Sequence, residues 1–230
     1  MATNNALVLG ATGLTGSFFL KRAAVWEGIN KVYSITRRKV PFEVKAEEIV
    51  EEDNSKWATL IPNDIQYLFT ALATTRAAAG GFDKQYAIDH DLNIELAKEA
   101  KAKGCETIVV VSSAGANKCS WLPYLKMKGE IEEDLINLKF KNTIILRPSA
   151  LLGHRENDHK GFGNNIFVAI SNQFYRSRFQ RVMAYPVQAH EVAEAGIQAA
   201  IEASKQTSDK PFVRFIESKE ILDIAEQIKK

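Results

Sequence analysis

Short apolar segments alternate along the chain with longer segments in which apolar residues recur every three or four positions. The first pattern is typical of buried strands, and the second is typical of helices with one buried face. The pattern predicts strands over residues 6–9, 31–36, 48–51, 66–72, 107–111, 143–146 and 212–216. It predicts helices over residues 14–26, 82–103, 122–138, 161–175, 189–204 and 218–230.

This alternation predicts an α/β fold, a doubly wound parallel sheet with helices on both faces. We expect one domain over residues 1–230. Residues 1–150 would form its core, residues 151–188 a small region on the substrate side, and residues 189–230 a returning helix, strand and helix. The least regular segment, LGHRENDHKGFGNN at 152–165, follows the end of a predicted strand. Ligands of such sheets bind beyond the carboxyl ends of the strands.

The composition excludes several classes of protein. The 230 residues include 30 basic and 28 acidic ones, for a net charge of +2, which is too balanced for a dedicated nucleic-acid-binding protein. A hydrophobic content of 46% excludes intrinsic disorder. The two cysteines and four histidines have no spacing typical of a metal site, so we expect no metal and a reducing compartment.

The N-terminus shows no targeting signal. Residues 6–20 are uncharged but contain three glycines, so they are a poor candidate for a membrane span. No basic residue precedes Lys21, so we expect neither a secretory leader nor an Arg-rich presequence, and no cleavable leader of any kind.

The first predicted strand runs into a glycine-rich turn, GATGLTG, in which Gly10, Gly13 and Gly16 are three residues apart. In dinucleotide-binding folds one glycine permits a tight turn, another lets the backbone approach a pyrophosphate, and a third lets the helix pack close to the sheet. The start of the following helix offers free amides to the phosphates. The turn therefore predicts a dinucleotide site, and the alternative is a turn that merely needs small residues.

The residues at the end of the second predicted strand indicate which dinucleotide the chain binds, NAD or NADP. NAD-preferring enzymes place a carboxylate there, on the ribose 2′-hydroxyl. This chain instead has Arg37 and Arg38 after Thr36. Two guanidiniums suit the additional 2′-phosphate of NADP. The alternative is a solvated basic turn.

A second group of residues has the chemistry of a reductase. Ser112 and Ser113 end the fifth predicted strand, and Tyr124 and Lys128 follow on the next helix. Residues four apart share one face of a helix, and a nearby ammonium lowers a tyrosine pKa. Such a tyrosine can give a proton to a carbonyl oxygen that a serine hydroxyl also binds. The alternative is an exposed helix start with a solvated lysine.

Together these residues resemble the short-chain dehydrogenase/reductase superfamily in its atypical branch, and in particular the Tat-interacting-protein-like oxidoreductases and their fungal, mitochondria-associated members. The resemblance covers residues 6–156, about two-thirds of the chain. It is carried by LVLGATGLTGSFFL, SITRR, FTALATTRAAAGGFDKQY with IDHDLN, ELAK with AKAKGCETIVVVSSAGAN, YLKMKGEIEEDL and ILRPSALLGHRE.

The resemblance implies a Rossmann-type fold that binds NADP(H). It implies that the phosphate loop is formed by Gly10, Thr12, Gly13, Leu14, Thr15 and Gly16, and that Arg37 and Arg38 bind the 2′-phosphate. Asp53 would contact the adenine, and Leu72, Ala73 and Thr74 would line the cofactor after the fourth strand. Pro148 would flank the nicotinamide. It implies catalysis by Ser113, with Ser112 as the alternative, and by Tyr124 and Lys128.

The implied activity is hydride transfer between NADP(H) and a small carbonyl or alcohol substrate, with tyrosine as the proton donor. One departure from the family pattern is ALAT at residues 71–74, where catalytic members often have an Asn-Ala-Gly turn. A non-catalytic NADPH-binding adaptor or redox sensor is therefore the alternative, and an epimerase shares every motif.

The resemblance also implies peripheral attachment to the cytosolic face of the mitochondrial outer membrane, with a cytoplasmic location as the alternative. Many relatives form homodimers, so a homodimer is one arrangement open to the chain. Residues 174–181, FYRSRFQR, combine aromatic and basic side chains. They are the candidate membrane-facing patch, and the alternative is a solvated face between two packed aromatics.

Overall fold

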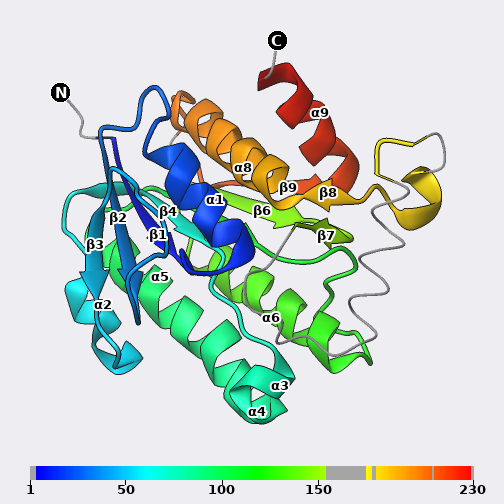
Figure 1. The fold of residues 1–230 in the computed structure, drawn as a ribbon, viewed down its shortest axis with the longest axis horizontal. Helices are drawn as coiled ribbons and strands as arrows, with labels where there is room; N and C mark the ends of the chain where they lie inside the picture. The colour runs from blue at the N-terminus through cyan, green and yellow to red at the C-terminus, as the bar shows by residue number, and fades with distance from the viewer. Residues whose placement is uncertain (1–3, 154–174, 178–179, 209, 229–230) are drawn as a thin grey trace.

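The computed structural model describes residues 4–153, 175–177, 180–208 and 210–228 (Figure 1). In this part of the chain seven parallel strands form one sheet in the order β3-β2-β1-β4-β5-β6-β9. Their bounds are β1 Asn5–Leu9, β2 Lys31–Thr36, β3 Glu47–Val50, β4 Ile65–Thr70, β5 Thr107–Val111, β6 Asn142–Arg147 and β9 Phe212–Glu217. A separate parallel pair joins β7 (Leu151–Leu152) and β8 (Val187–Gln188).

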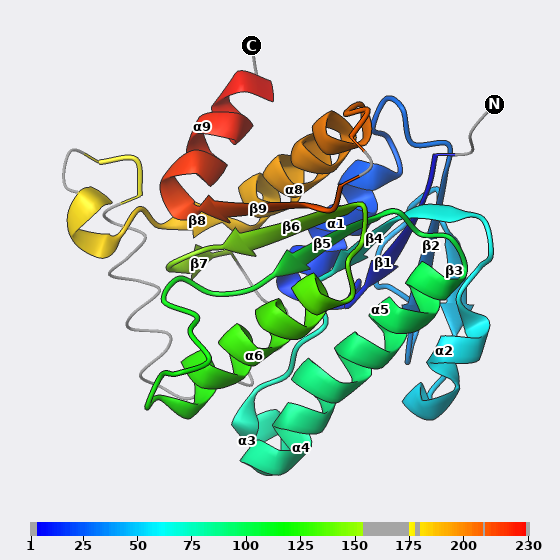
Figure 2. The ribbon, with the colours of Figure 1, turned by 180° about the vertical axis from the view of Figure 1, so that it is seen from behind.

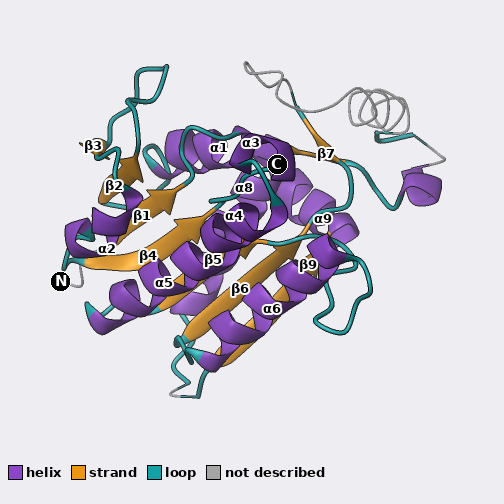
Figure 3. Ribbon diagram, turned by 90° about the horizontal axis from the view of Figure 1, so that it is seen from below, coloured by secondary structure: helices purple, strands orange, loops and turns teal. Residues whose placement is uncertain are grey.

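Helices cover both faces of the large sheet, as Figures 2 and 3 show from two directions. One face packs against α1 (Leu14–Ala23), α8 (Ala189–Ser204) and α9 (Ser218–Ile228). The other packs against α2 (Trp57–Leu60), α5 (Asn93–Ala102) and α6 (Pro123–Asn137). Two buried apolar clusters, one on each face, form the core. The predicted doubly wound α/β fold is confirmed.

The order of the strands fixes where a ligand can bind. From β1 the chain first builds the sheet outward through β2 and β3, and then returns to add β4, β5, β6 and β9 on the other side. Loops that leave β1 and β4 therefore diverge to opposite faces, which opens a crevice at the carboxyl ends of these strands. The predicted site segments all follow the carboxyl ends of β1, β2, β3, β4, β5 and β6.

Some boundaries differ from the sequence predictions. The first helix ends at Ala23 rather than at residue 26, because the chain leaves the helix through a turn that reaches Gly28 at a φ of 92°. The fourth strand ends at Thr70 rather than at 72. The helix predicted over 82–103 consists of α4 (Phe82–Tyr86), a π-helical segment (Ala87–Leu92) and α5. The pattern did not predict the short elements 3₁₀ Asn54–Lys56, α2, α3 (Arg76–Ala79), β7, β8 and 3₁₀ Gln180–Met183.

Two features lie partly outside the described residues. Of the helix predicted over 161–175, only residue 175 is among the described residues. The last helix is described only as far as Ile228. Among the described residues, none of the helices is both long and apolar enough to span a bilayer. The same residues contain no cluster of side chains that could hold a metal ion.

Candidate functional site

The glycine turn after β1 packs as tightly as a phosphate loop requires. Gly10 has a φ of 78°, and a Cβ added there would lie 2.6 Å from the carbonyl oxygen of Ala71. The backbone N–H of Gly13 donates to the carbonyl of Gly10 at 2.8 Å. A Cβ on Gly16 would lie 2.0 Å from that same carbonyl oxygen. The turn and the helix are therefore in backbone contact, which any side chain would prevent.

The start of α1 is open to an anion. Gly13 is the N-cap residue, so no side chain satisfies the first amides, and the first turn contains no acidic residue. Thr12 is exposed and Thr15 is buried, while the Leu14 side chain packs against Gly153, beyond β7. Free amides at the positive end of a helix attract phosphate.

Arg37 and Arg38 follow β2, which pairs with β1 so that Ile35 lies beside Leu9. Both arginines are exposed, and among the described residues neither guanidinium has a hydrogen bond or an ion pair. Asp53 follows β3 and is also exposed. Its carboxylate accepts hydrogen bonds from the Ser55 hydroxyl at 2.6 Å and from the Ser55 amide at 3.1 Å, and these bonds lower the pKa of Asp53.

The segment Leu72–Thr74 is held by polar side chains that sequence reasoning missed. The Asn93 amide donates to the Leu72 carbonyl at 2.9 Å. Asp89 accepts from the Thr74 amide at 2.6 Å, and the Gln85 amide donates to the Thr74 carbonyl at 3.1 Å. Three buried polar residues at spacings of four, on a helical stretch that follows such a loop, are the signal that could have indicated this anchor.

The structure places the two serines after β5 in different surroundings. Ser112 is buried, and its hydroxyl donates to Glu132 Oε1 at 2.5 Å. Ser113 is only partly buried, and its hydroxyl makes a long hydrogen bond of 3.3 Å to the Ala114 carbonyl. Consecutive residues of an extended segment point to opposite sides. Of the two hydroxyls, that of Ser113 is the one available to a ligand.

The tyrosine and the lysine lie in the first two turns of α6. Tyr124 is 45% exposed, whereas Lys128 is 5% exposed. The Lys128 Nζ lies 6.0 Å from the centre of the Tyr124 ring and 3.5 Å from the carbonyl oxygen of Val111, the last residue of β5. The structure therefore brings the helix pair and the serine-bearing strand end together. A lysine that is predicted as solvated in the alternative interpretation is in fact buried.

A carboxylate that was not predicted lies in the same region. Asp89 is fully buried in the π-helical segment, and its Oδ2 atom has no hydrogen-bond partner among the residues that the structure describes. Burial raises the pKa of Asp89, and the positive charge of Lys128 opposes that rise. Asp89 therefore interacts with Lys128, the lysine that lies near the ring of the candidate tyrosine.

Pro148 follows β6 and is buried. Its carbonyl accepts from the Ala114 amide at 2.9 Å, so the loops after β5 and β6 are joined just beyond the sheet. This contact places the predicted nicotinamide flank next to the segment that carries Ser113.

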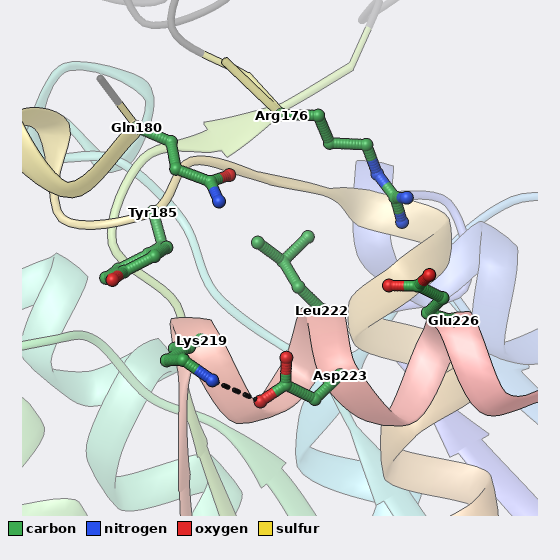
Figure 4. A pocket seen from close by; sticks show the side chains of 7 residues that line it. All are labelled: Arg176, Gln180, Tyr185, Lys219, Leu222, Asp223 and Glu226. Carbon is green, nitrogen blue, oxygen red and sulfur yellow. Dashed lines mark hydrogen bonds and ion pairs between the residues drawn. The ribbon is translucent and has the colours of Figure 1, made fainter. Parts of the chain in front are cut away.

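The candidate membrane-facing patch lies partly outside the described residues, at 174, 178 and 179. Within the described part, Arg176 Nη2 is paired with Glu191 Oε1 at 2.9 Å, and the Tyr175 hydroxyl donates to the same carboxylate at 2.7 Å. A hollow of about 230 Å³ adjoins this segment (Figure 4). Among the described residues, its walls contain none that was predicted to bind the cofactor or to act in catalysis. They are formed by Arg176, Gln180, Tyr185, Lys219, Leu222, Asp223 and Glu226.

Comparison with known proteins gives both a family and a fold. The family model HIM1 matches residues 23–185. The chain is 60% identical over 230 residues to "Protein FMP52, mitochondrial" of Candida glabrata, covering 100% of this chain and 99% of the relative. It is 56% identical to the protein of that name in Saccharomyces cerevisiae, covering 98% of each chain. The label of a Tat-interacting-protein-like oxidoreductase is not among these matches.

Solved structures with a similar fold include proteins whose titles name a nucleotide sugar. One is MoeE5 in complex with UDP-glucose and NAD, with a TM-score of 0.67 and 16% identity over 98% of this chain and 82% of that chain. Another is the UDP-N-acetylglucosamine 4-epimerase of Methanobrevibacter ruminantium, with a TM-score of 0.64 and 17% identity over 100% of this chain and 84% of that chain. At such identities the likeness establishes a Rossmann-type fold alone.

Proposed function

The chain belongs to the HIM1 family, and from that premise we propose that it is an NADP(H)-dependent oxidoreductase acting on a small carbonyl or alcohol substrate. One observation carries the proposal. A phosphate-loop geometry beside two exposed guanidiniums, and a Ser-Tyr-Lys group, lie at the same edge of one parallel sheet. The first half suits the cofactor, and the second suits proton transfer to a carbonyl oxygen.

The residues present fit NADP(H). Gly10 and Gly16 keep the turn in backbone contact with its neighbours, a close approach that a Cβ would prevent. The uncapped start of α1 offers free amides for the pyrophosphate. Thr12, Leu14 and Thr15 would wrap around it. Arg37 and Arg38 would hold the 2′-phosphate, with Asp53 near the adenine. Leu72, Ala73, Thr74 and Pro148 would line the rest of the cofactor. The single NAD-bound neighbour cited above supports a nicotinamide dinucleotide in such a crevice, although NAD is the form it carries.

When bound, the cofactor would supply a hydride for the carbonyl carbon. Ser113 donates a hydrogen bond to the carbonyl oxygen and orients it. Tyr124 gives its phenolic proton to that oxygen, and the ammonium of Lys128 stabilises the phenolate that remains. Because Lys128 is buried against the end of β5, its charge acts in a medium of low dielectric constant.

The ALAT segment after β4 favours a second candidate function, that of an NADPH-binding adaptor or redox sensor without turnover. Both functions use the glycine turn and the arginine pair. Only the oxidoreductase needs the hydroxyl of Tyr124.

We further propose a single domain with residues 151–188 on the substrate side, and peripheral attachment at the mitochondrial outer membrane. The name "mitochondrial" that the FMP52 relatives carry supports the organelle. The attachment and its membrane face rest on the family resemblance alone.

Calorimetric titration of the whole chain with NADPH and then with NADH tests the cofactor. The two ligands differ only in the 2′-phosphate, so we expect NADPH to bind about 100-fold more tightly. Equal affinities would overturn the NADP assignment, and binding of neither would overturn the function. A screen of aldehydes and ketones for NADPH oxidation then separates the oxidoreductase, which turns over, from the sensor, which does not.

A further inference from the structure

Glu132 is a buried carboxylate that joins three elements of the candidate site. It lies on α6 and is 4% exposed. It accepts hydrogen bonds from the Ser112 hydroxyl at 2.5 Å, from Arg147 Nε at 2.9 Å and from Arg147 Nη2 at 2.6 Å. The partners come from the loop after β5 and from the last residue of β6. One side chain therefore connects α6 with both strand ends.

Each partner stands next to a residue of the proposed site. Ser112 directly precedes Ser113, and Arg147 directly precedes Pro148. Glu132 itself lies four residues after Lys128, on the same face of α6. A shift of the carboxylate would thus change the spacing between the serine, the tyrosine–lysine pair and the nicotinamide flank at the same time.

The contact is of the strong and directional kind. Two parallel N–H donors of one guanidinium meet the two oxygens of one carboxylate, which fixes both planes. The guanidinium is clamped further, because Arg147 lies 4.3 Å from the centre of the Phe215 ring and its Nη1 lies 3.4 Å from Glu217 Oε1. Neither partner can rotate away without leaving a buried charge unpaired.

We propose that Glu132 is a positioning residue that sets the geometry of Ser113, Tyr124 and Lys128 relative to the nicotinamide end of the cofactor. This inference rests on the proposed function. It assigns to Glu132 no contact with substrate or cofactor. Its carboxylate acts through Ser112 and Arg147, and both of its oxygens are required. In a glutamine, one oxygen is replaced by an NH₂ group that would face the donors of Arg147.

The test compares Glu132→Gln with a matched control, Glu194→Gln. Glu194 is also buried, at 3% exposed, and is also paired with a guanidinium, Arg22 Nη2 at 2.6 Å, but it lies on α8 at the opposite face of the sheet. Both variants should lower the thermal midpoint by roughly 3 °C or more. For each, NADPH affinity is measured by calorimetry, and the nicotinamide environment by the emission of bound NADPH.

We expect Glu132→Gln to keep NADPH affinity within about three-fold, because the phosphate loop and the arginine pair lie on other strands, while it changes the emission of bound NADPH. Turnover of a carbonyl found in the screen should fall about 100-fold, mainly in kcat. Glu194→Gln should leave emission and turnover as in the wild type. Arg147→Lys keeps the positive charge but loses the two parallel N–H donors of the guanidinium. It should change the emission of bound NADPH and the turnover in the same direction as Glu132→Gln, and by less.

If Glu132→Gln matches Glu194→Gln in emission and kcat, the positioning role is wrong and the proposed function stands. Should Glu132→Gln fail to fold, the emission of bound NADPH and the kcat of Arg147→Lys test the positioning role instead. If the wild type binds no NADPH, the proposed function fails and this inference fails with it.

Discussion

The ammonium of Lys128 is the main influence that opposes the rise of the Asp89 pKa on burial. The two groups come from different elements, the π-helical segment and α6, and both are buried. Asp89 Oδ1 accepts from the Thr74 amide, whereas Oδ2 has no hydrogen-bond partner within the described part of the chain. The pKa of Asp89 nevertheless stays above the 3.8 of an ordinary aspartate, because the desolvation of this carboxylate outweighs the attraction of the lysine.

This balance predicts how Asp89→Asn changes stability with pH. The native state holds the Asp89 proton more tightly than the unfolded chain, so the free energy of unfolding contributed by Asp89 falls as pH rises from 3.8 through the raised pKa. Asparagine does not titrate and can still accept the Thr74 hydrogen bond. The stability of Asp89→Asn relative to the wild type should therefore increase between about pH 4 and about pH 7. Urea unfolding of both proteins at the two pH values measures it, and a relative stability that falls with pH would contradict the assignment.

The parts of the candidate site that lie close together along the chain could be predicted from the sequence. The glycine spacing from Gly10 to Gly16 and the spacing from Tyr124 to Lys128 are local patterns with a known geometric consequence. The residues that hold these groups were missed, because their partners are remote. Glu132 meets Ser112 across 20 positions, and Asn93 meets Thr70 across 23. Such contacts depend on which elements the fold brings together.

The π-helical segment was missed for a different reason. Apolar residues along 82–103 recur at spacings of three and four, which predicts one continuous helix. A π turn adds one residue without disturbing that pattern visibly. Within this segment the Asp89 carbonyl accepts from the Asn93 side chain at 2.8 Å. The short helices α2 and α3, of four residues each, are below the length at which periodicity can be recognised.

Replacement of both arginines after β2 tests the 2′-phosphate site. Arg37→Ala with Arg38→Ala should weaken NADPH by about 100-fold, the worth of two charge-assisted hydrogen bonds, and leave NADH nearly unchanged. Lys39→Ala removes one exposed positive charge from the same turn and is the matched control, with an expected effect of about two-fold. Calorimetry on all three proteins measures the affinities. Equal losses for NADPH and NADH would exclude a 2′-phosphate role.

Tyr124→Phe tests the proton donor. The ring remains and only the hydroxyl is lost, so NADPH affinity should stay within about two-fold while turnover falls about 100-fold or more. Tyr86→Phe is the control. Tyr86 stacks on His90 at 4.6 Å, and burial raises the pKa of its hydroxyl to about 12, so this group is a poor proton donor. Steady-state rates of NADPH oxidation are compared between the two variants and the wild type. Undiminished turnover in Tyr124→Phe would remove this residue as the acid.

Two glycines with positive φ separate backbone strain from loss of the phosphate loop. Gly10 has a φ of 78° and Gly104 one of 93°, but only at Gly10 would a Cβ meet another atom, the Ala71 carbonyl oxygen at 2.6 Å. Gly104→Ala should therefore cost about 1 kcal/mol from strain alone and leave NADPH binding intact. Gly10→Ala must also push the loop away from β4, so it should destabilise the protein by more than Gly104→Ala and weaken NADPH by about ten-fold or more. Urea unfolding and calorimetry on both variants measure the two effects. Similar NADPH affinities in the two variants would show that the close approach of Gly10 to Ala71 does not serve the cofactor.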